Sequence, residues 1–212
     1  MAKALDKLTN IAGEALSSAV LPSAVDFLKH ASLLKHELFE LLTKKNGFYA
    51  FESALHVFPT HTNGNEMGLA DWNDHQLWCG EYQDMVHDCL FFAEDVFGGQ
   101  FCIKANGVYL FDPETGSFEF FSDNLEQWAH VLLSDYEVLT GYPLAHSWQK
   151  VNGPLEAGHR LIPKIPFVTG GEFSAENLVA IESAKGMRMR ANLAQQIRSL
   201  PDGSSISWKV VD

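Results

Sequence analysis

The sequence predicts an α+β fold in which helices flank a mostly antiparallel sheet with a central hairpin meander. Two observations support this class, and a third argues against a membrane protein. Apolar residues recur at helical spacing near the N-terminus and again after residue 124. Between these regions, short apolar and aromatic runs alternate with glycine-containing turns, as in consecutive β-hairpins. No uninterrupted apolar run approaches the ~18 residues that a membrane-spanning helix needs.

Two helices are expected before the first strand. The first covers residues 3–19, where leucines and alanines follow a helical period before Pro22 interrupts it. The second covers residues 23–43, with Ser23 as its N-cap and Gly47 beyond its C-terminal end.

The segment that follows mixes aromatic and polar residues. Residues 48–58 predict a loop followed by a short strand, because aromatic and β-branched side chains are common in strands. Residues 60–68 predict a polar turn. A short helix is then expected over residues 71–82, with Asp71 as its cap.

The central part of the chain has the pattern of an antiparallel meander. The glycine pairs and the Asn-Gly pair between its runs favour hairpin turns, which need a positive φ. Because the runs are almost continuously apolar, both faces of the sheet are expected to be covered. The four runs are residues 90–93, 100–104, 108–111 and 118–121.

A third long helix is expected after the meander, over residues 125–140, with Asp123 as its cap and Gly141 beyond its end. The rest of the chain predicts strands at 161–168, 177–181 and 206–210 and a helix at 187–200. In that helix the expected inward residues are Met189, Leu193, Ala194, Ile197 and Leu200. Because no flexible linker interrupts the sequence, residues 1–212 are expected to form a single domain.

The net charge of −12 is unevenly distributed. Residues 46–149 contain 16 Asp and Glu residues and a single cation, Lys104, which gives this segment a charge of −15. The remaining residues hold 11 acids and 14 bases. Such a segment repels phosphate and argues against nucleic-acid binding. It suits a basic protein partner, although an acidic surface that only maintains solubility explains the charge equally well.

The nine histidines do not form a recognisable metal site. A structural zinc site uses four ligands, usually in paired short spacings. His56, His61 and His75 precede Cys79 and Glu81, but their spacing fits no such pattern. We therefore expect no metal, and we interpret these histidines as core or surface residues.

Signals of nucleophilic catalysis are also missing. The sequence has no G-x-S-x-G motif, and it has no phosphate-binding loop. The chain has three cysteines, an odd number that cannot all pair in disulfides, and they form no CxxC motif. They are Cys79, Cys89 and Cys102, and all have apolar neighbours in the sequence. These features predict free, inert thiols in a reducing cytoplasm. We therefore expect a cytoplasmic protein that is not an enzyme, needs no cofactor and does not associate with membranes.

Three segments together resemble the central hairpins of the SUKH superfamily of Smi/Knr-like proteins. They are Leu-Phe-Phe-Ala-Glu-Asp at 90–95, Gly-Gly-Gln-Phe-Cys-Ile at 98–103 and Gly-Val-Tyr-Leu-Phe-Asp at 107–112. The resemblance covers roughly residues 23–142 and leaves residues 143–212 as a C-terminal extension. Residues 48–59 and 135–141 are similar to a bacterial subfamily with a longer C-terminal part.

This resemblance implies an α+β fold with a mostly antiparallel sheet and a role in protein binding. Many bacterial members of the superfamily are immunity proteins that neutralise toxins, often nucleases, by direct contact. A basic toxin would be complementary to the acidic segment, so an immunity protein is the leading functional hypothesis. The sequence indicates no oligomeric state.

The partner-binding surface is expected where acids and aromatic residues coincide. Seven acids occur between residues 71 and 95 without an intervening cation, namely Asp71, Asp74, Glu81, Asp84, Asp88, Glu94 and Asp95. Buried aromatic anchors within a charged rim are typical of protein interfaces. The candidate anchors are Trp72, Trp78, Tyr82 and Phe97.

An alternative function is a small-ligand-binding protein or a hydrolase-type enzyme. Its cleft would lie between the sheet and the C-terminal extension, near His56, His61, Glu94 and Asp95. Separately, Lys104 is expected to form an ion pair, because many carboxylates surround this single cation in the sequence.

Overall fold

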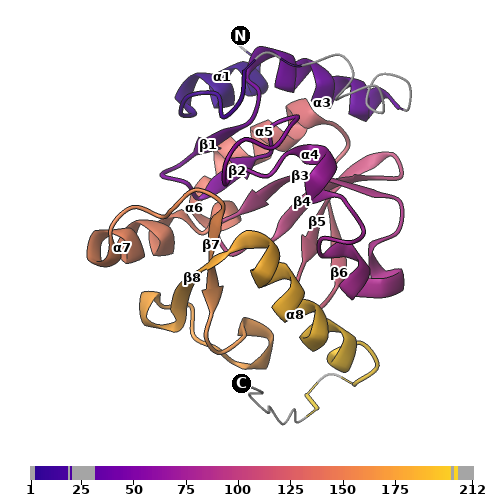
Figure 1. Cartoon of the computed structure of the whole chain (residues 1–212), viewed down its shortest axis with the longest axis vertical. Helices are drawn as coiled ribbons and strands as arrows, with labels where there is room; N and C mark the ends of the chain where they lie inside the picture. The colour runs from indigo at the N-terminus through magenta and orange to yellow at the C-terminus, as the bar shows by residue number, and fades with distance from the viewer. Residues whose placement is uncertain (1–2, 19, 21–31, 202, 205–212) are drawn as a thin grey trace.

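The computed structural model describes residues 3–18, 20, 32–201 and 203–204. These residues contain a six-stranded antiparallel sheet and a separate two-stranded sheet, both flanked by helices (Figure 1). The predicted α+β class is therefore confirmed. None of the described helices is long and apolar enough to cross a bilayer.

The six strands follow one another across the large sheet in chain order. The predicted meander is confirmed as its last four strands, and two short strands precede them where one was expected. The strands are β1 (Phe48–Ala50), β2 (Leu55–Val57), β3 (Cys89–Asp95), β4 (Gln100–Lys104), β5 (Gly107–Asp112) and β6 (Ser117–Ser122).

Three helices pack together at one end of the molecule, with α5 against the sheet and α1 and α3 against α5 (Figure 1). They are α1 (Ala4–Ile11), α3 (Leu33–Lys44) and α5 (Leu125–Ser134). The Trp128 ring of α5 is fully buried against Phe92 and Phe101, with centroid separations of 5.2 and 5.8 Å. These edge-to-face contacts fix the helix on the centre of the sheet.

Carboxylates from neighbouring helices satisfy the free N–H groups at two helix starts. Glu126 of α5 accepts hydrogen bonds from the backbone N–H groups of Ala4 and Leu5. Glu37 of α3 accepts one from Leu125 at 3.0 Å. Such caps also complement the positive end of the helix dipole. The N-cap of α5 is Asn124, one residue after the Asp123 expected from the sequence.

The first helix is shorter than the expected 3–19. Lys45 Nζ donates to the carbonyls of Thr9, Ala12 and Gly13 and so satisfies the C-terminal end of α1. The chain then pairs along the sheet edge, where the Gly13 N–H donates to the Tyr49 carbonyl at 2.8 Å. The first part of the expected second helix, including Ser23, lies outside the described residues.

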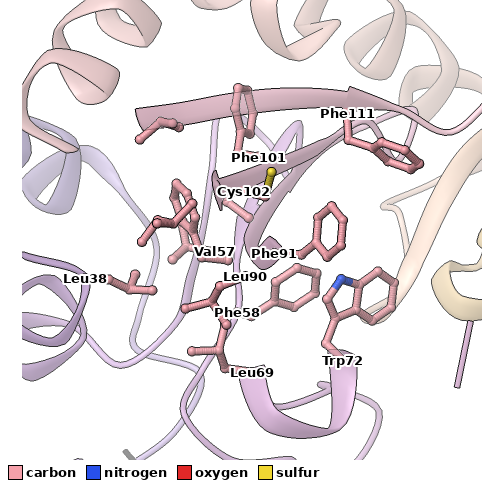
Figure 2. Close-up of a cluster of buried hydrophobic side chains, with 14 of the residues drawn as sticks. Leu38, Val57, Phe58, Leu69, Trp72, Leu90, Phe91, Phe101, Cys102 and Phe111 are labelled. Atoms are coloured by element: carbon pink, nitrogen blue, oxygen red, sulfur yellow. The ribbon is translucent and has the colours of Figure 1, made fainter. Parts of the chain in front are cut away.

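The other face of the sheet holds an aromatic cluster beneath α4 (Leu69–Trp72) and the short 3-10 helix η2 (Cys79–Val86). Trp72 stacks on Phe58 with a centroid separation of 4.6 Å, as Figure 2 shows. Trp78 packs against Phe91 at 4.9 Å. The side chains of these residues are all buried and form the second half of the core.

The single helix expected over residues 71–82 is therefore wrong. Asn73 explains the interruption, because its side-chain amide donates to the Phe91 carbonyl and accepts from the Phe91 N–H, each at 2.8 Å. This exchange of hydrogen bonds attaches the chain to β3 directly after α4. Asp71 lies within α4 and is not its cap.

The C-terminal extension packs against the sheet at the end opposite α1 and α3 (Figure 1). The expected helix over 125–140 is divided at Asp135, and α8 begins earlier and ends earlier than expected. Met189 and Leu200 are exposed, which corrects their inward assignment, and the expected strand 206–210 lies outside the described residues. The elements are α6 (Tyr136–Thr140), α7 (Tyr142–Asn152), β7 (His159–Pro163), η3 (Phe167–Thr169), η4 (Ala175–Asn177), β8 (Leu178–Glu182) and α8 (Ser183–Ile197).

Trp128 is the side chain on which the helical face of the core depends most. We expect Trp128→Ala to lower the free energy of unfolding by about 3–5 kcal/mol, because it leaves a cavity between α5 and the sheet. Phe120→Ala removes a half-exposed ring on β6 and should cost less than about 1 kcal/mol. Urea unfolding of both variants checks this, and equal losses would contradict the assignment of Trp128 to the core.

Candidate functional site: a buried ion pair beside an acidic, aromatic pocket

A single row of directly opposed residues crosses the sheet from β1 to β4. Tyr49 pairs with His56, His56 with Glu94, and Glu94 with Gln100. Directly opposed residues project from the same face of a sheet, so these polar groups lie side by side. His56, Glu94 and Gln100 are buried. Arg160 of β7 contacts this row, as do Ser183 and Met187 of α8.

Glu94 lies at the centre of this row, with three groups around its carboxylate. His56 Nδ1 lies 3.0 Å and Arg160 Nε 2.8 Å from its Oε1, and Gln100 donates to its Oε2 at 3.0 Å. Burial alone would raise the pKa of Glu94. The charge of Arg160 and the hydrogen bonds from His56 and Gln100 outweigh it and lower the pKa to about 2.

Arg160 reaches this position from β7 in the C-terminal extension. Its side chain is 1% exposed, and its guanidinium lies over the Tyr49 ring at 5.3 Å from the centroid. Burial opposes its charge, but the neighbouring Glu94 carboxylate raises the pKa of Arg160. The ion pair therefore attaches the extension to the middle of the sheet.

His56 is a structural member of this network. Burial lowers the pKa of His56 despite the nearby carboxylates, and its Nδ1 lies within hydrogen-bond distance of the Glu94 carboxylate, which can only accept when ionised. Neither His56 nor Glu94 lines the acidic cavity described below or either of two surface hollows at the N-terminal helices, among the described residues. His61 lies apart from them and bonds to Ser17. Of the four residues expected to line one cleft, only Asp95 lines one of these cavities.

Asp95 lines a different cavity, an acidic pocket of about 320 Å³ where the extension meets the ends of β3 and β5. Three carboxylates, one guanidinium and several phenylalanine rings surround it. Its lining residues are Asp95, Phe97, Gly99, Leu110, Phe111, Asp112, Pro113, Glu114, Phe167, Val168, Phe173 and Arg190. We refer to this site as the acidic pocket.

Backbone N–H groups hold one oxygen of each of two pocket carboxylates. Asp95 Oδ1 accepts from Phe97 and Gly99, each at 2.8 Å, and Glu114 Oε2 accepts from Val168 at 2.9 Å. Glu114 is 4% exposed, and its Oε1 has no hydrogen-bond partner among the described residues. Burial raises the pKa of Asp95 to about 7 and also raises the pKa of Glu114.

The pocket guanidinium belongs to Arg190 of α8 and is already engaged by the protein. Its Nη1 donates to the Phe97 carbonyl at 2.6 Å and its Nε to the Gly186 carbonyl at 3.1 Å. The bond to Phe97 attaches the turn between β3 and β4 to α8, and the bond to Gly186, within α8, holds the guanidinium in place. Within the described residues, no group of three or more His, Cys, Asp or Glu side chains could hold a metal ion.

The structure corrects much of the expected partner-binding surface. Trp72, Trp78 and Tyr82 are at most 1% exposed and belong to the core, so they cannot be exposed anchors. Phe97 is half-buried and lines the acidic pocket. The exposed acids of the expected set are Asp71, Asp74, Glu81, Asp84 and Asp88.

Arginines of the extension pair with acids that have no nearby cation in the sequence. Arg198 Nη2 lies 2.6 Å from Asp84 Oδ2, and Arg160 pairs with Glu94. Two of the seven acids of the expected surface, Asp84 and Glu94, are therefore offset by cations that lie outside residues 71–95. The sequence shows an excess of basic residues outside residues 46–149, which indicates that some acids inside this segment are neutralised. It does not indicate which acid each arginine pairs with.

The expected ion pair of Lys104 is also wrong within the described part of the chain. Lys104 Nζ donates to the His87 carbonyl at 2.8 Å, lies 3.6 Å from Cys89 Sγ and lies over the Phe118 ring at 4.8 Å. A hydrogen bond from Cys102 and the charge of Lys104 lower the pKa of the half-buried Cys89 thiol.

Comparison with known proteins supports the fold and nothing more specific. No model of a protein family matches the sequence, and no curated protein matches it. The chain is similar to the solved structure described as the crystal structure of Atu4351 from Agrobacterium tumefaciens, with 9% sequence identity and a TM-score of 0.57. The match covers 88% of this chain and 87% of that one. At this identity the similarity shows a shared fold alone.

The ion pair predicts a specific dependence of stability on pH. The pKa of Glu94 is lowered from 4.5 to about 2, so its contribution to stability is present above pH 4.5 and is lost as the pH falls towards 2. This contribution amounts to about 3 kcal/mol. Glu94→Gln should remove this acid-sensitive component and lower the free energy of unfolding at pH 7 by about 3–5 kcal/mol, because Arg160 stays buried without its partner.

Denaturant unfolding between pH 2 and 7 measures both effects. Glu81→Gln is the matched control, because Glu81 is exposed and its neutralisation should change stability by less than about 0.5 kcal/mol. If Glu94→Gln and the control had the same pH profile, the ion pair would not be a major source of stability.

The surroundings of Cys89 predict selective thiol chemistry, in contrast to the inert thiols expected from the sequence. Cys79 and Cys102 are buried, and the pKa values of both thiols are raised. Burial raises the pKa of Cys79 to about 12. Iodoacetamide should therefore modify Cys89 first. Lys104→Met should slow this modification several-fold by removing the adjacent charge, whereas Lys150→Met, on an exposed residue of α7, should not. Peptide mass spectrometry over time measures the three thiols separately.

Proposed function

We propose that this protein is a non-enzymatic protein-binding module with a basic partner, and that the acidic pocket and its rim form the binding surface. The observation that carries this proposal is the combination of charge and exposed apolar surface at one place. The pocket contains three carboxylates against one guanidinium. Phe173 and Val168 line it and remain 68% and 44% exposed, so they present apolar surface directly beside the carboxylates, as apolar anchors of protein interfaces do.

The electrostatics of the chain support a basic partner. Five exposed acids on or near α4 and η2 add to the negative field of the pocket, although Arg198 offsets one of them, Asp84. Complementary fields accelerate association and disfavour acidic partners. The resemblance to the SUKH superfamily suggests that this partner is a toxin and that the protein acts as its immunity protein.

A small-ligand-binding function is the second candidate, and the observation in its favour is the position of Asp95. Of the four residues expected to line a ligand cleft, Asp95 is the one that lines the acidic pocket. Its pKa is raised to about 7, and such shifts are typical of functional carboxylates. The exposed apolar rim favours the protein-binding proposal, because a small ligand would leave that rim uncovered.

The proposal is tested by capture of the partner with matched surface variants. The tagged protein is incubated with a lysate of its source organism and with the products of neighbouring genes. We expect the protein to capture a basic protein. The Phe173→Ser variant should bind this partner with at least ten-fold lower affinity, because an aromatic ring at the centre of the contact is lost. Phe120→Ser, which removes a half-exposed ring outside the pocket, is the control and should leave capture unchanged.

Two outcomes would contradict the proposal. One is the absence of any specific partner at low and moderate salt. The other is a partner whose capture is equally insensitive to both substitutions, since it would then bind elsewhere on the molecule. Raising the salt concentration should weaken a true partner mainly by slowing its association.

A further inference from the structure

We propose that the acidic pocket is a binding site for one alkylammonium group, the side chain of a lysine that the partner inserts. This inference rests on the proposed function and specifies its chemistry. It depends on four properties of the pocket, which are its charge, the free oxygen of Glu114, the aromatic rings and the way in which the carboxylate oxygens are already used.

The charge balance of the pocket favours a cation. Asp95, Asp112 and Glu114 face a single guanidinium, that of Arg190. The nitrogens of Arg190 are already engaged by the protein, because Nη1 and Nε donate to the carbonyls of Phe97 and Gly186 and Nη2 donates to Met187 Sδ at 3.5 Å. A bound cation would offset the excess of carboxylates and favour their ionised forms.

Glu114 supplies the second, independent indication of a ligand. Its side chain is 4% exposed and lines the pocket, and its Oε1 has no partner among the described residues. A buried polar atom without a hydrogen bond is costly, and a ligand that donates to it removes this cost. An ammonium group has three donors and no acceptor, so it suits an oxygen of this kind.

The way the carboxylates are held distinguishes an ammonium from a guanidinium group. A guanidinium binds best to a carboxylate that offers both oxygens at once. Here Asp95 Oδ1 and Glu114 Oε2 are occupied by backbone N–H groups, and both oxygens of Asp112 accept hydrogen bonds from Glu114 and Thr115. Asp95 and Glu114 therefore each keep a single oxygen that no backbone N–H occupies, an arrangement that a compact ammonium group matches better than a guanidinium group does.

The aromatic rings provide a path for the apolar stem of a lysine. Phe173 stacks on Phe167 with a centroid separation of 3.9 Å, and Phe167 meets Phe97 edge to face at 5.4 Å. Phenylalanine faces attract cations and also pack against methylene groups. A pocket of about 320 Å³ has room for a lysine side chain beside these rings.

The test uses small probes, so it does not depend on the partner. Nα-acetyl-lysine amide is titrated into the full-length protein, and the backbone amides of Phe97, Gly99 and Val168 are followed by NMR, since they bond to the pocket carboxylates. We expect saturable shifts of these amides. The norleucine analogue, which lacks the ammonium group, should not cause them, and the arginine analogue should bind several-fold more weakly.

Variants locate the binding in the pocket. Glu114→Gln should weaken the lysine probe about ten-fold, because a charged acceptor is lost. Glu119→Gln, which neutralises an exposed acid of β6, should not change the affinity. If Glu114→Gln does not fold, Phe173→Ser replaces it, since this ring is 68% exposed and its loss should leave the fold intact while weakening the probe a few-fold.

Several results would overturn the inference. Equal binding of the norleucine probe would show an apolar site, and tighter binding of the arginine probe would show that paired oxygens are presented. Absence of saturable binding would show that the carboxylates have only a structural role. Capture of a basic partner without probe binding would leave the proposed function intact, and probe binding without any partner would refute only the proposed function.

Discussion

The buried ion pair between Glu94 and Arg160 is the contact on which the arrangement of the molecule depends. Glu94 lies in the middle of the large sheet, and Arg160 comes from the C-terminal extension 66 positions later. Two charges removed from water require close geometry and additional hydrogen bonds, and His56 and Gln100 supply these on the side of the carboxylate. The pair therefore defines where β7 lies on the sheet.

The position of the extension decides the electrostatic character of the surface. Its arginines pair with Glu94 and Asp84, and Arg190 lies beside the turn that contains Phe97. Part of the negative charge of residues 46–149 is thus neutralised within the chain. Of the remaining acids, three line the acidic pocket and four exposed ones, Asp71, Asp74, Glu81 and Asp88, lie on or near α4 and η2. Net charge alone therefore overstated the acidic surface and misplaced its centre.

The acidic pocket belongs neither to the sheet nor to the extension alone. Asp95 and Asp112 end strands β3 and β5, and Glu114 lies in the turn after β5, whereas Phe167, Phe173 and Arg190 come from the extension. The structural similarity to Atu4351 covers most of the chain, so the fold is shared across both parts. Because folds of this kind do not determine function, the argument for a basic partner depends on the chemistry of this pocket and on its exposed apolar rim.

The sequence by itself determined the fold class and the meander, because hairpin turns such as Gly98-Gly99 and Asn106-Gly107 and the helical periodicity are local properties. It identified Asp95 and Phe97 as site residues but also selected Trp72, Trp78 and Tyr82, because composition does not distinguish a core aromatic residue from an exposed one. Only the tertiary structure decided which arginine meets which acid and brought Glu114 together with Phe173. These contacts depend on how distant segments pack, and no local pattern specifies that packing.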